Sequence, residues 1–167
     1  MATNTFRITS DMLASQGQRF LNYLIDLGLQ YGVGLLFGVF IAVIANVFGN
    51  YTLLDFFESM GRIEEYLVGT VISLIYYALC ETFLSRTLGK YITKTIVVME
   101  DGSKPDASTI LKRSFSRIIP FNALSFLSNS GRGWHDSISG TYVVKKDLFE
   151  EQRKLFYSFD EIGKQEE

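Results

Sequence analysis

Two long runs without formal charge dominate the pattern of hydrophobic and polar positions. The first covers residues 27–54 and the second covers residues 66–80. A helix needs about 20 mostly apolar residues to cross the hydrocarbon core of a membrane. The first run exceeds this length, and the second reaches it if the helix continues past Glu81. The pattern therefore predicts two transmembrane helices, at about residues 20–48 and 66–85.

A third apolar segment, at about residues 118–128, is much shorter. Its most apolar part, residues 118–127, would rise only about 15 Å as a helix, which is half the thickness of the hydrocarbon core. Pro120 suits the first turn of a helix. We expect a short third helix that lies in the interface or re-enters the membrane without crossing it.

Two short runs rich in β-branched residues follow the second predicted span. Residues 93–100 read TKTIVVME and end at the turn signal Asp101-Gly102, and residues 141–146 read TYVVKK. We expect these runs to pair as a small cytoplasmic β-like hairpin. The fold class is thus an all-α membrane protein with this one β element, in which residues 1–146 form the membrane domain and residues 147–167 form a charged cytoplasmic tail.

The basic segment LKRSFSR, residues 111–117, follows Ser108, which is a plausible N-cap for a helix. Such a helix would present Lys112, Arg113 and Arg117 to anionic lipid headgroups. The loop between the predicted spans carries four carboxylates against one arginine, whereas residues 86–117 carry seven lysines and arginines. The positive-inside rule places the basic segment, and with it both termini, in the cytoplasm.

The overall composition excludes several classes of function. The 16 basic and 18 acidic residues nearly cancel, so net charge does not predict nucleic-acid binding. Cys80 is the only cysteine, which rules out an intrachain disulfide and an all-thiolate metal site. His135 is the only histidine, and no nucleophile or second metal ligand stands at a recognisable spacing from it. We expect no enzyme activity, no metal site and no cofactor.

Polar residues recur along one face of the first predicted span. They are Arg19, Asn22, Asp26 and Gln30, spaced three or four residues apart. Glu81 lies near the cytoplasmic end of the antiparallel second span, at a depth similar to that of Asp26. A carboxylate buried beside a guanidinium can exchange a proton or a cation, because burial raises its pKa and the positive charge lowers it. Asp26 and Glu81 are therefore candidate ligands for a monovalent cation, with neutral oxygens from the two amides.

Small residues also recur on the first span. Gly28 with Gly32, and Gly34 with Gly38, have the small-xxx-small spacing that lets another backbone approach closely. The partner could be the second span or another copy of the chain.

Four pieces of sequence in this order resemble the RDD family of small bacterial membrane proteins. They are the arginine followed by LID, then TLGKYITKTIVVMEDGSKP, then RSFSRIIPF, and finally GRGWHDSISGTYVVKK. The family is named after an arginine and two aspartates, which correspond by motif position to Arg19, Asp26 and Asp136. The resemblance implies a helical domain in the bacterial cytoplasmic membrane, and sodium/proton antiport has been attributed to some members. The third hydrophobic segment is shorter here than is usual in the family.

Two functions remain open at this point. The first is a small oligomeric transporter that couples cations to protons through Arg19, Asp26 and Glu81. The second is a non-transporting scaffold or assembly partner, in which Arg19, Asp26 and Asp136 form a structural ion-pair network and His135 makes local hydrogen bonds. Both place the chain in a lipid bilayer, with another copy or a membrane partner beside it.

Overall fold

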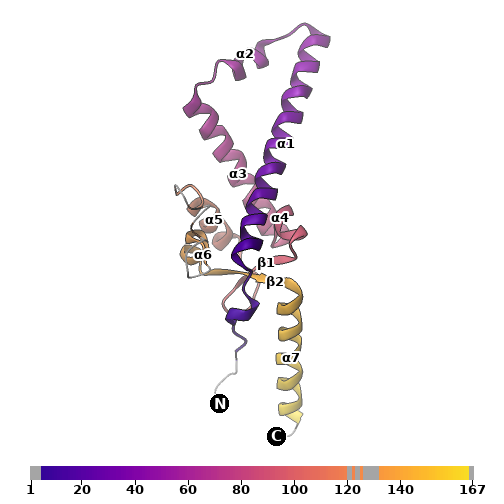
Figure 1. Cartoon of the computed structure of the whole chain (residues 1–167), viewed down its shortest axis with the longest axis vertical. Coiled ribbons are helices and arrows are strands. Elements are labelled where there is room, and N and C mark those ends of the chain that lie inside the picture. The colour runs from indigo at the N-terminus through magenta and orange to yellow at the C-terminus, as the bar shows by residue number, and fades with distance from the viewer. Residues whose placement is uncertain (1–4, 120–121, 123–124, 126–131, 166–167) are drawn as a thin grey trace.

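The computed structural model describes residues 5–119, 122, 125 and 132–165. Most of the third apolar segment, including Pro120, lies outside these residues. The longest helices are α1 (Gln16–Phe48) and α3 (Arg62–Leu84), and the short helix α2 (Thr52–Glu58) joins their far ends (Figure 1). Both long helices are long and apolar enough to cross a membrane, in agreement with the two predicted spans.

Local sequence signals explain where α1 begins and ends. The Ser15 side chain accepts a hydrogen bond from the backbone of Gln18, and the Gln18 side chain accepts one from the backbone of Ser15. This reciprocal capping satisfies two backbone donors that a helix start leaves open. At the other end, Gly49 takes the left-handed conformation, with φ of 66°, which ends the helix.

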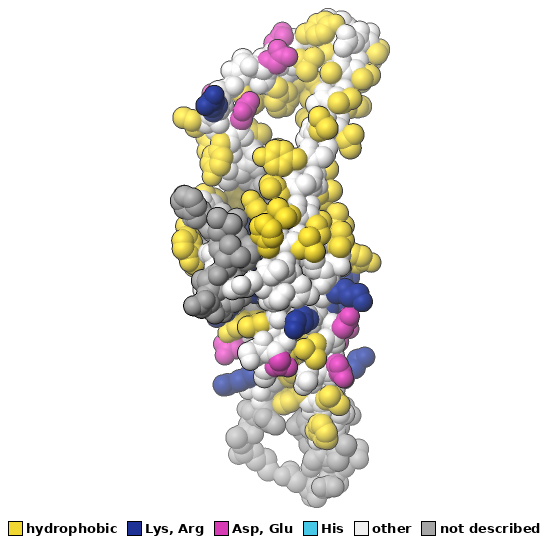
Figure 2. All heavy atoms as spheres, viewed as in Figure 1, with side chains coloured by type: hydrophobic (Ala, Val, Ile, Leu, Met, Phe, Trp, Pro, Cys, Tyr) yellow, Lys and Arg dark blue, Asp and Glu magenta, His cyan; other side chains and the backbone are white. Residues whose placement is uncertain are grey.

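The two long helices diverge from the charged end of the molecule toward α2 (Figure 1). In the most apolar stretch of each helix, only 11% of the residues are buried. Hydrophobic side chains cover this part of the molecule, whereas charged side chains gather mainly around its other end (Figure 2). An apolar surface of this extent is typical of helices that lie in a membrane or in an interface with another protein.

The charged end is built around a two-stranded antiparallel sheet. Strand β1 (Thr95–Met99) pairs with β2 (Thr141–Lys145), with Val97 opposite Val143. The predicted pairing of the two β-branched runs is thus confirmed. The connection is not a tight hairpin, however, because the chain between the strands contains α5 (Ala107–Ser116) and α6 (Trp134–Ser139). Only the local turn at Asp101-Gly102 follows β1 as expected.

The two faces of this sheet have different neighbours. Successive residues of a strand point to opposite faces, so Ile96, Val98 and Val144 share one face. That face packs against an apolar cluster with Phe6, Met12 and Phe149. The other face carries Thr95 and Thr141, which are fully buried and contact side chains from α1 and α5. The sheet therefore separates an apolar core from a polar one.

Two further elements complete the charged end. Helix α4 (Leu88–Ile92) follows α3 and packs on α1, and helix α7 (Lys146–Gln165) starts directly after β2. The charged tail is thus helical over its described length. Phe156 of α7 packs edge-to-face on Phe6. Helix α5 is capped by Asp106, whose side chain accepts from the backbone of Thr109, so the N-cap prediction for Ser108 is wrong by two residues.

Candidate functional site

Asp26 lies where α1 meets α4, and its carboxylate is only 1% exposed. It accepts hydrogen bonds from the Tyr76 hydroxyl at 2.9 Å, the Thr87 hydroxyl at 2.6 Å and the backbone N–H of Gly89 at 2.8 Å. All three donors are neutral. Arg19 forms its ion pair with Asp136, so the expectation that Arg19 holds Asp26 is corrected.

Gly89 allows α4 to approach α1 at this point. A Cβ atom at residue 89 would lie 2.4 Å from the carbonyl oxygen of Asn22 and 3.0 Å from Oδ1 of Asp26. Any larger residue would push the two backbones apart, because real Cβ atoms do not come so close to a carbonyl oxygen. The glycines of α1 that were predicted to allow a close helix contact have no neighbour within 4 Å of an added Cβ among the described residues, so that prediction stays open.

Asp136 is the meeting point of two buried arginines. Its two oxygens form ion pairs with Arg19 of α1 and Arg113 of α5. Asp136 also accepts from the backbone N–H of Gly133 at 3.0 Å, as residues near a helix start often do. The Arg113 guanidinium donates to the Thr141 hydroxyl as well. One carboxylate therefore joins α1, α5, α6 and, through Arg113, strand β2.

Glu81 is the second fully buried carboxylate of this network. Oε2 accepts from Nε of Arg113 at 2.9 Å, while Oε1 accepts from Nζ of Lys90 at 2.8 Å and from Nη2 of Arg117 at 2.9 Å. Because Arg113 also pairs with Asp136, it links the two carboxylates into one continuous network. Glu81 is thus bound by three basic side chains, whereas Asp26 is bound by neutral donors.

These charges shift the pKa values of the groups outside the long helices. Burial alone would raise the pKa of Asp136, but the positive charges of Arg113 and Arg19 hold it well below its ordinary value. Burial lowers the pKa of His135 well below its ordinary value, against the pull of the Asp136 carboxylate. Burial also lowers the pKa of Lys90, although Glu81 opposes this shift. The histidine is therefore neutral and Asp136 is ionised near pH 7.

His135 is held by a polar contact with Asn122. Its backbone N–H donates to Oδ1 of Asn122 at 3.1 Å, and its ring Nδ1 lies 3.1 Å from the same oxygen. Nε2 lies 3.5 Å from Oδ1 of Asp136. His135 thus makes the local hydrogen bonds predicted for it and adjoins the charge network.

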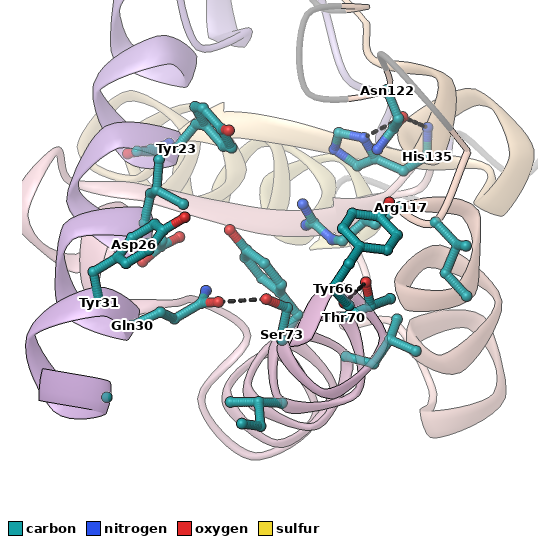
Figure 3. Close-up of a pocket in the computed structure, with 18 of the residues that line it drawn as sticks. Tyr23, Asp26, Gln30, Tyr31, Tyr66, Thr70, Ser73, Arg117, Asn122 and His135 are labelled. Atoms are coloured by element: carbon teal, nitrogen blue, oxygen red, sulfur yellow. Dashed lines mark hydrogen bonds between the residues drawn. The ribbon is translucent and has the colours of Figure 1, made fainter. Parts of the chain in front are cut away.

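A cavity of about 960 Å³ opens between α1, α3 and the charge network. Figure 3 shows Tyr23, Asp26 and Gln30 on the α1 side, with Arg117 and His135 facing them from across the cavity. The hydroxyl of Ser73 in α3 donates to the side chain of Gln30, and this contact joins the two long helices along the cavity wall. The cavity is charged beside the network and again at Arg62 and Glu65 of α3, and most of the wall between is apolar.

The charged residues that were predicted to form a site, Arg19, Asp26, Glu81 and Asp136, are all buried, but they belong to two separate sites. Arg19, Glu81 and Asp136 belong to one charge network, whereas Asp26 sits in its own cradle of neutral donors. Asn22 is buried against the hydroxyls of Thr93 and Thr95. Among the described residues, no group of three histidine, cysteine or acidic side chains is placed to hold a metal ion.

Sequence reasoning missed the basic side chains at the centre of the network. Arg113 was expected to face lipid headgroups, but it is fully buried and binds both Glu81 and Asp136. Lys90 and Arg117 were likewise not assigned to Glu81. The i, i+4 spacing of Arg113 in α5 and Arg117 at its C-cap puts both on one face, and this pattern could have indicated a shared acidic partner.

A family model for the RDD family matches residues 13–140, about three quarters of the chain. The chain belongs to the RDD family. The searches of curated proteins and of solved structures each gave no match. In this RDD protein, Arg19 and Asp136 form an ion pair, and Asp26 has three other hydrogen-bond donors. The matched region includes both candidate spans and the charged residues of the network, and it ends directly before β2 and α7.

Proposed function

We propose that this RDD protein is a membrane-embedded assembly subunit, in which the charge network is a structural clamp. The observation that carries this proposal is that hydrogen-bond donors of the protein already bind Asp26, Glu81 and Asp136. Asp136 accepts from two arginines, Glu81 accepts from three basic side chains, and Asp26 accepts from three neutral donors. A cation would have to displace these donors before it could bind. The clamp ties the two spans to the small sheet and its helices.

The uncovered surface of α1 supports a role in assembly. Gly28 and Gly32 lie two and six residues after Asp26, which places them on the side of α1 away from the clamp. A Cβ atom added at either glycine would meet nothing within 4 Å. Glycines at this spacing allow close approach of another helix in a membrane. We propose that a second copy of the chain packs here.

We place the charged end of the molecule in the cytoplasm of a bacterial cell, with both termini on that side. The basic side chains after the second span support this orientation, and the α2 region, which carries Asp55 and Glu58, then faces the outside. In this orientation, α7 projects into the cytoplasm, where it is available to a soluble partner (Figure 1).

Proton-coupled cation transport is the second candidate. It is favoured by the position of Asp26 and Gln30 on the wall of the cavity between the two spans. Intramembrane carboxylates that face a cavity commonly mark ion or proton paths. In this candidate, the hydrogen bonds of Tyr76 and Thr87 to Asp26 exchange with a cation during the cycle.

Proton flux in proteoliposomes separates the two candidates. The purified protein is reconstituted, a pH gradient is imposed, and pulses of Na⁺, K⁺ or Li⁺ are given while the internal pH is recorded. The assembly proposal expects the same trace for the protein, for Asp26→Asn and for the exposed control Asp55→Asn. Cation-dependent proton movement that is lost in Asp26→Asn and kept in Asp55→Asn would replace the assembly proposal with transport.

A further inference from the structure

Three arginines that line the cavity between α1 and α3 carry buried guanidinium nitrogens that the charge network leaves without a partner. These atoms are Nε and Nη2 of Arg19, Nη2 of Arg113 and Nε of Arg117, and none has a hydrogen-bond partner among the described residues. Arg19 is 5% exposed and Arg113 is fully buried. All three arginines line the same cavity. A buried guanidinium donor without an acceptor is costly, so the arrangement favours an anionic group at this end.

The charge balance of the network points to the same kind of ligand. Arg19, Lys90, Arg113 and Arg117 meet only two carboxylates, Glu81 and Asp136. Asp26 also lines the cavity, and the basic side chains still outnumber the carboxylates by one. An excess positive charge with little access to water is stabilised by an anion. Arginine forks match the oxygens of phosphate particularly well.

Away from the charge network, most of the cavity wall is apolar, with Arg62 and Glu65 at the start of α3 as the charged exceptions. From Arg19 the wall follows α1 as far as Leu35, a rise of about 24 Å. This exceeds the roughly 15 Å of one hydrocarbon leaflet, taken as half of a 30 Å core. Apolar residues such as Ile72 and Leu74 line the α3 side, and Gly34 and Gly69 widen the space. A soluble anion would leave this apolar part unused.

We propose that the cavity binds one anionic phospholipid, with its phosphate at Arg19, Arg113 and Arg117 and an acyl chain between α1 and α3. The phosphate pairs with the guanidinium groups of these arginines and offsets the excess positive charge of the network. The tyrosines at the cavity wall, Tyr23 and Tyr66, lie beside the chain. The bound lipid fills the space between the diverging helices and becomes part of the folded unit.

Binding of defined lipids to the full-length protein tests this assignment. The protein is purified in mild detergent, and the lipids that remain bound are counted by native mass spectrometry after addition of phosphatidylglycerol or phosphatidylcholine. Thermal unfolding is followed with the same lipids and with inorganic phosphate. We expect one tightly bound phosphatidylglycerol that raises the unfolding temperature, with a much smaller effect of phosphatidylcholine. Equal effects of the two lipids would overturn the proposal, as would full stabilisation by inorganic phosphate alone.

Two matched pairs of variants locate the site. Arg117→Gln removes a charge at the cavity, and Lys112→Gln removes one on the exposed side of the same helix. We expect Arg117→Gln to weaken phosphatidylglycerol binding by about tenfold, the loss of one charge-assisted hydrogen bond, and Lys112→Gln to leave it unchanged. Equal binding by these two variants would contradict the assigned position of the phosphate.

The second pair fills the cavity without changing any charge. A side chain at residue 69 has open space before it, so Gly69→Phe keeps the fold while occupying the room for the acyl chain. Val68→Phe adds a similar ring at the neighbouring position, which does not line the cavity. Loss of lipid in Gly69→Phe alone supports the proposal. Retention of the lipid in both variants would show that the chain lies elsewhere.

Discussion

Arg19 and Asp136 form a buried ion pair between residues that stand 117 positions apart in the sequence. The pair joins the first long helix to the short helix before β2, and the side chains of both residues are at most 4% exposed. Removal of one partner from a buried pair leaves a charge without compensation, which typically costs about 3–5 kcal/mol.

Arg19→Met should lower the free energy of unfolding by up to about 3 kcal/mol, because the buried Asp136 carboxylate keeps Arg113 but loses the second of its two arginine partners. The double variant Arg19→Met with Asp136→Leu should lose clearly less than the sum of the two single variants, because the contact between Arg19 and Asp136 can be lost only once. The measurement is thermal or denaturant unfolding in detergent, arranged as a double-mutant cycle. Additive losses would mean that the two side chains do not interact in solution.

Gly89→Ala should destabilise the contact between α4 and α1. The added Cβ would meet the carbonyl oxygen of Asn22 at 2.4 Å, and an overpacked contact of this kind costs about 1–3 kcal/mol. Gly34→Ala is the control, because its Cβ would meet open space. Unfolding temperatures of the two variants give the comparison. A Gly89→Ala protein as stable as Gly34→Ala would show that α4 can move away without cost.

Asp26→Asn should insert into the membrane and fold, with stability reduced by about 1–3 kcal/mol. The amide keeps the size of the side chain and one acceptor oxygen. Its NH₂ group, however, faces donors from Tyr76, Thr87 and the Gly89 backbone, and at least one donor then loses its acceptor. Membrane fractionation and unfolding in detergent measure the two effects. Failure to insert would mean that the carboxylate charge itself is required.

Stability should fall as the pH drops below about 6.5 because of His135. Its pKa in the folded protein lies well below the ordinary value of 6.5, so the unfolded chain takes up a proton that the folded chain refuses. In that window the loss approaches about 1.4 kcal/mol for each pH unit. Unfolding temperatures between pH 8 and pH 5 should show this slope, and His135→Gln should flatten it. An equal slope in the variant would assign the pH dependence to other groups.

Asp136 also lowers the stability of the protein as the pH falls, but in a lower pH range than His135. Its folded pKa lies below the unfolded value of 3.8, so its contribution is complete above about pH 4 and is lost as the pH falls toward the folded pKa. The two groups are thus separated by pH, and the measurement for His135 above pH 5 is free of Asp136.

Leucine at both Gly28 and Gly32 should shift the protein from oligomer to monomer in mild detergent. The two side chains would fill the surface on which a second copy is proposed to pack. Phe40→Leu with Val47→Leu serves as the control, since it exchanges one exposed apolar side chain for another elsewhere on α1. Light scattering after size exclusion reports the mass. An unchanged mass in the glycine variant would move the interface to another face.

The spans and the polar stripe were predictable from the sequence because both depend on local signals. A lack of charge over a membrane-length segment and a spacing of three or four residues need no knowledge of the tertiary structure. The pairing of β1 with β2 was predictable in the same way, from two short β-branched runs. The residues that bind this polar stripe could not be predicted in that way. Arg113, for example, stands in a basic segment that would equally suit a helix on the protein surface.

The hydrogen-bond donors of Asp26 could not be predicted from the sequence either. Its depth in α1 was readable from the helical rise, but its donors come from a hydroxyl of α3 and from the start of α4. The TLGK segment that forms this cradle is unremarkable in composition, and its role depends on how closely Gly89 can approach α1. Such a contact depends on tertiary packing and does not produce a periodic pattern in the sequence.

The long separation of Arg19 and Asp136 in the sequence has a consequence for biosynthesis. A ribosome delivers Arg19 with the first span, while its partner Asp136 emerges 117 residues later, in the helix directly before β2. At typical synthesis rates of 5–20 residues per second, Arg19 waits roughly 6–23 seconds for its partner. During that interval the nascent spans are held with polar groups uncompensated, which is costly in lipid. The newly made chain therefore depends on the insertion machinery, or on water at its surface, until its last strand arrives.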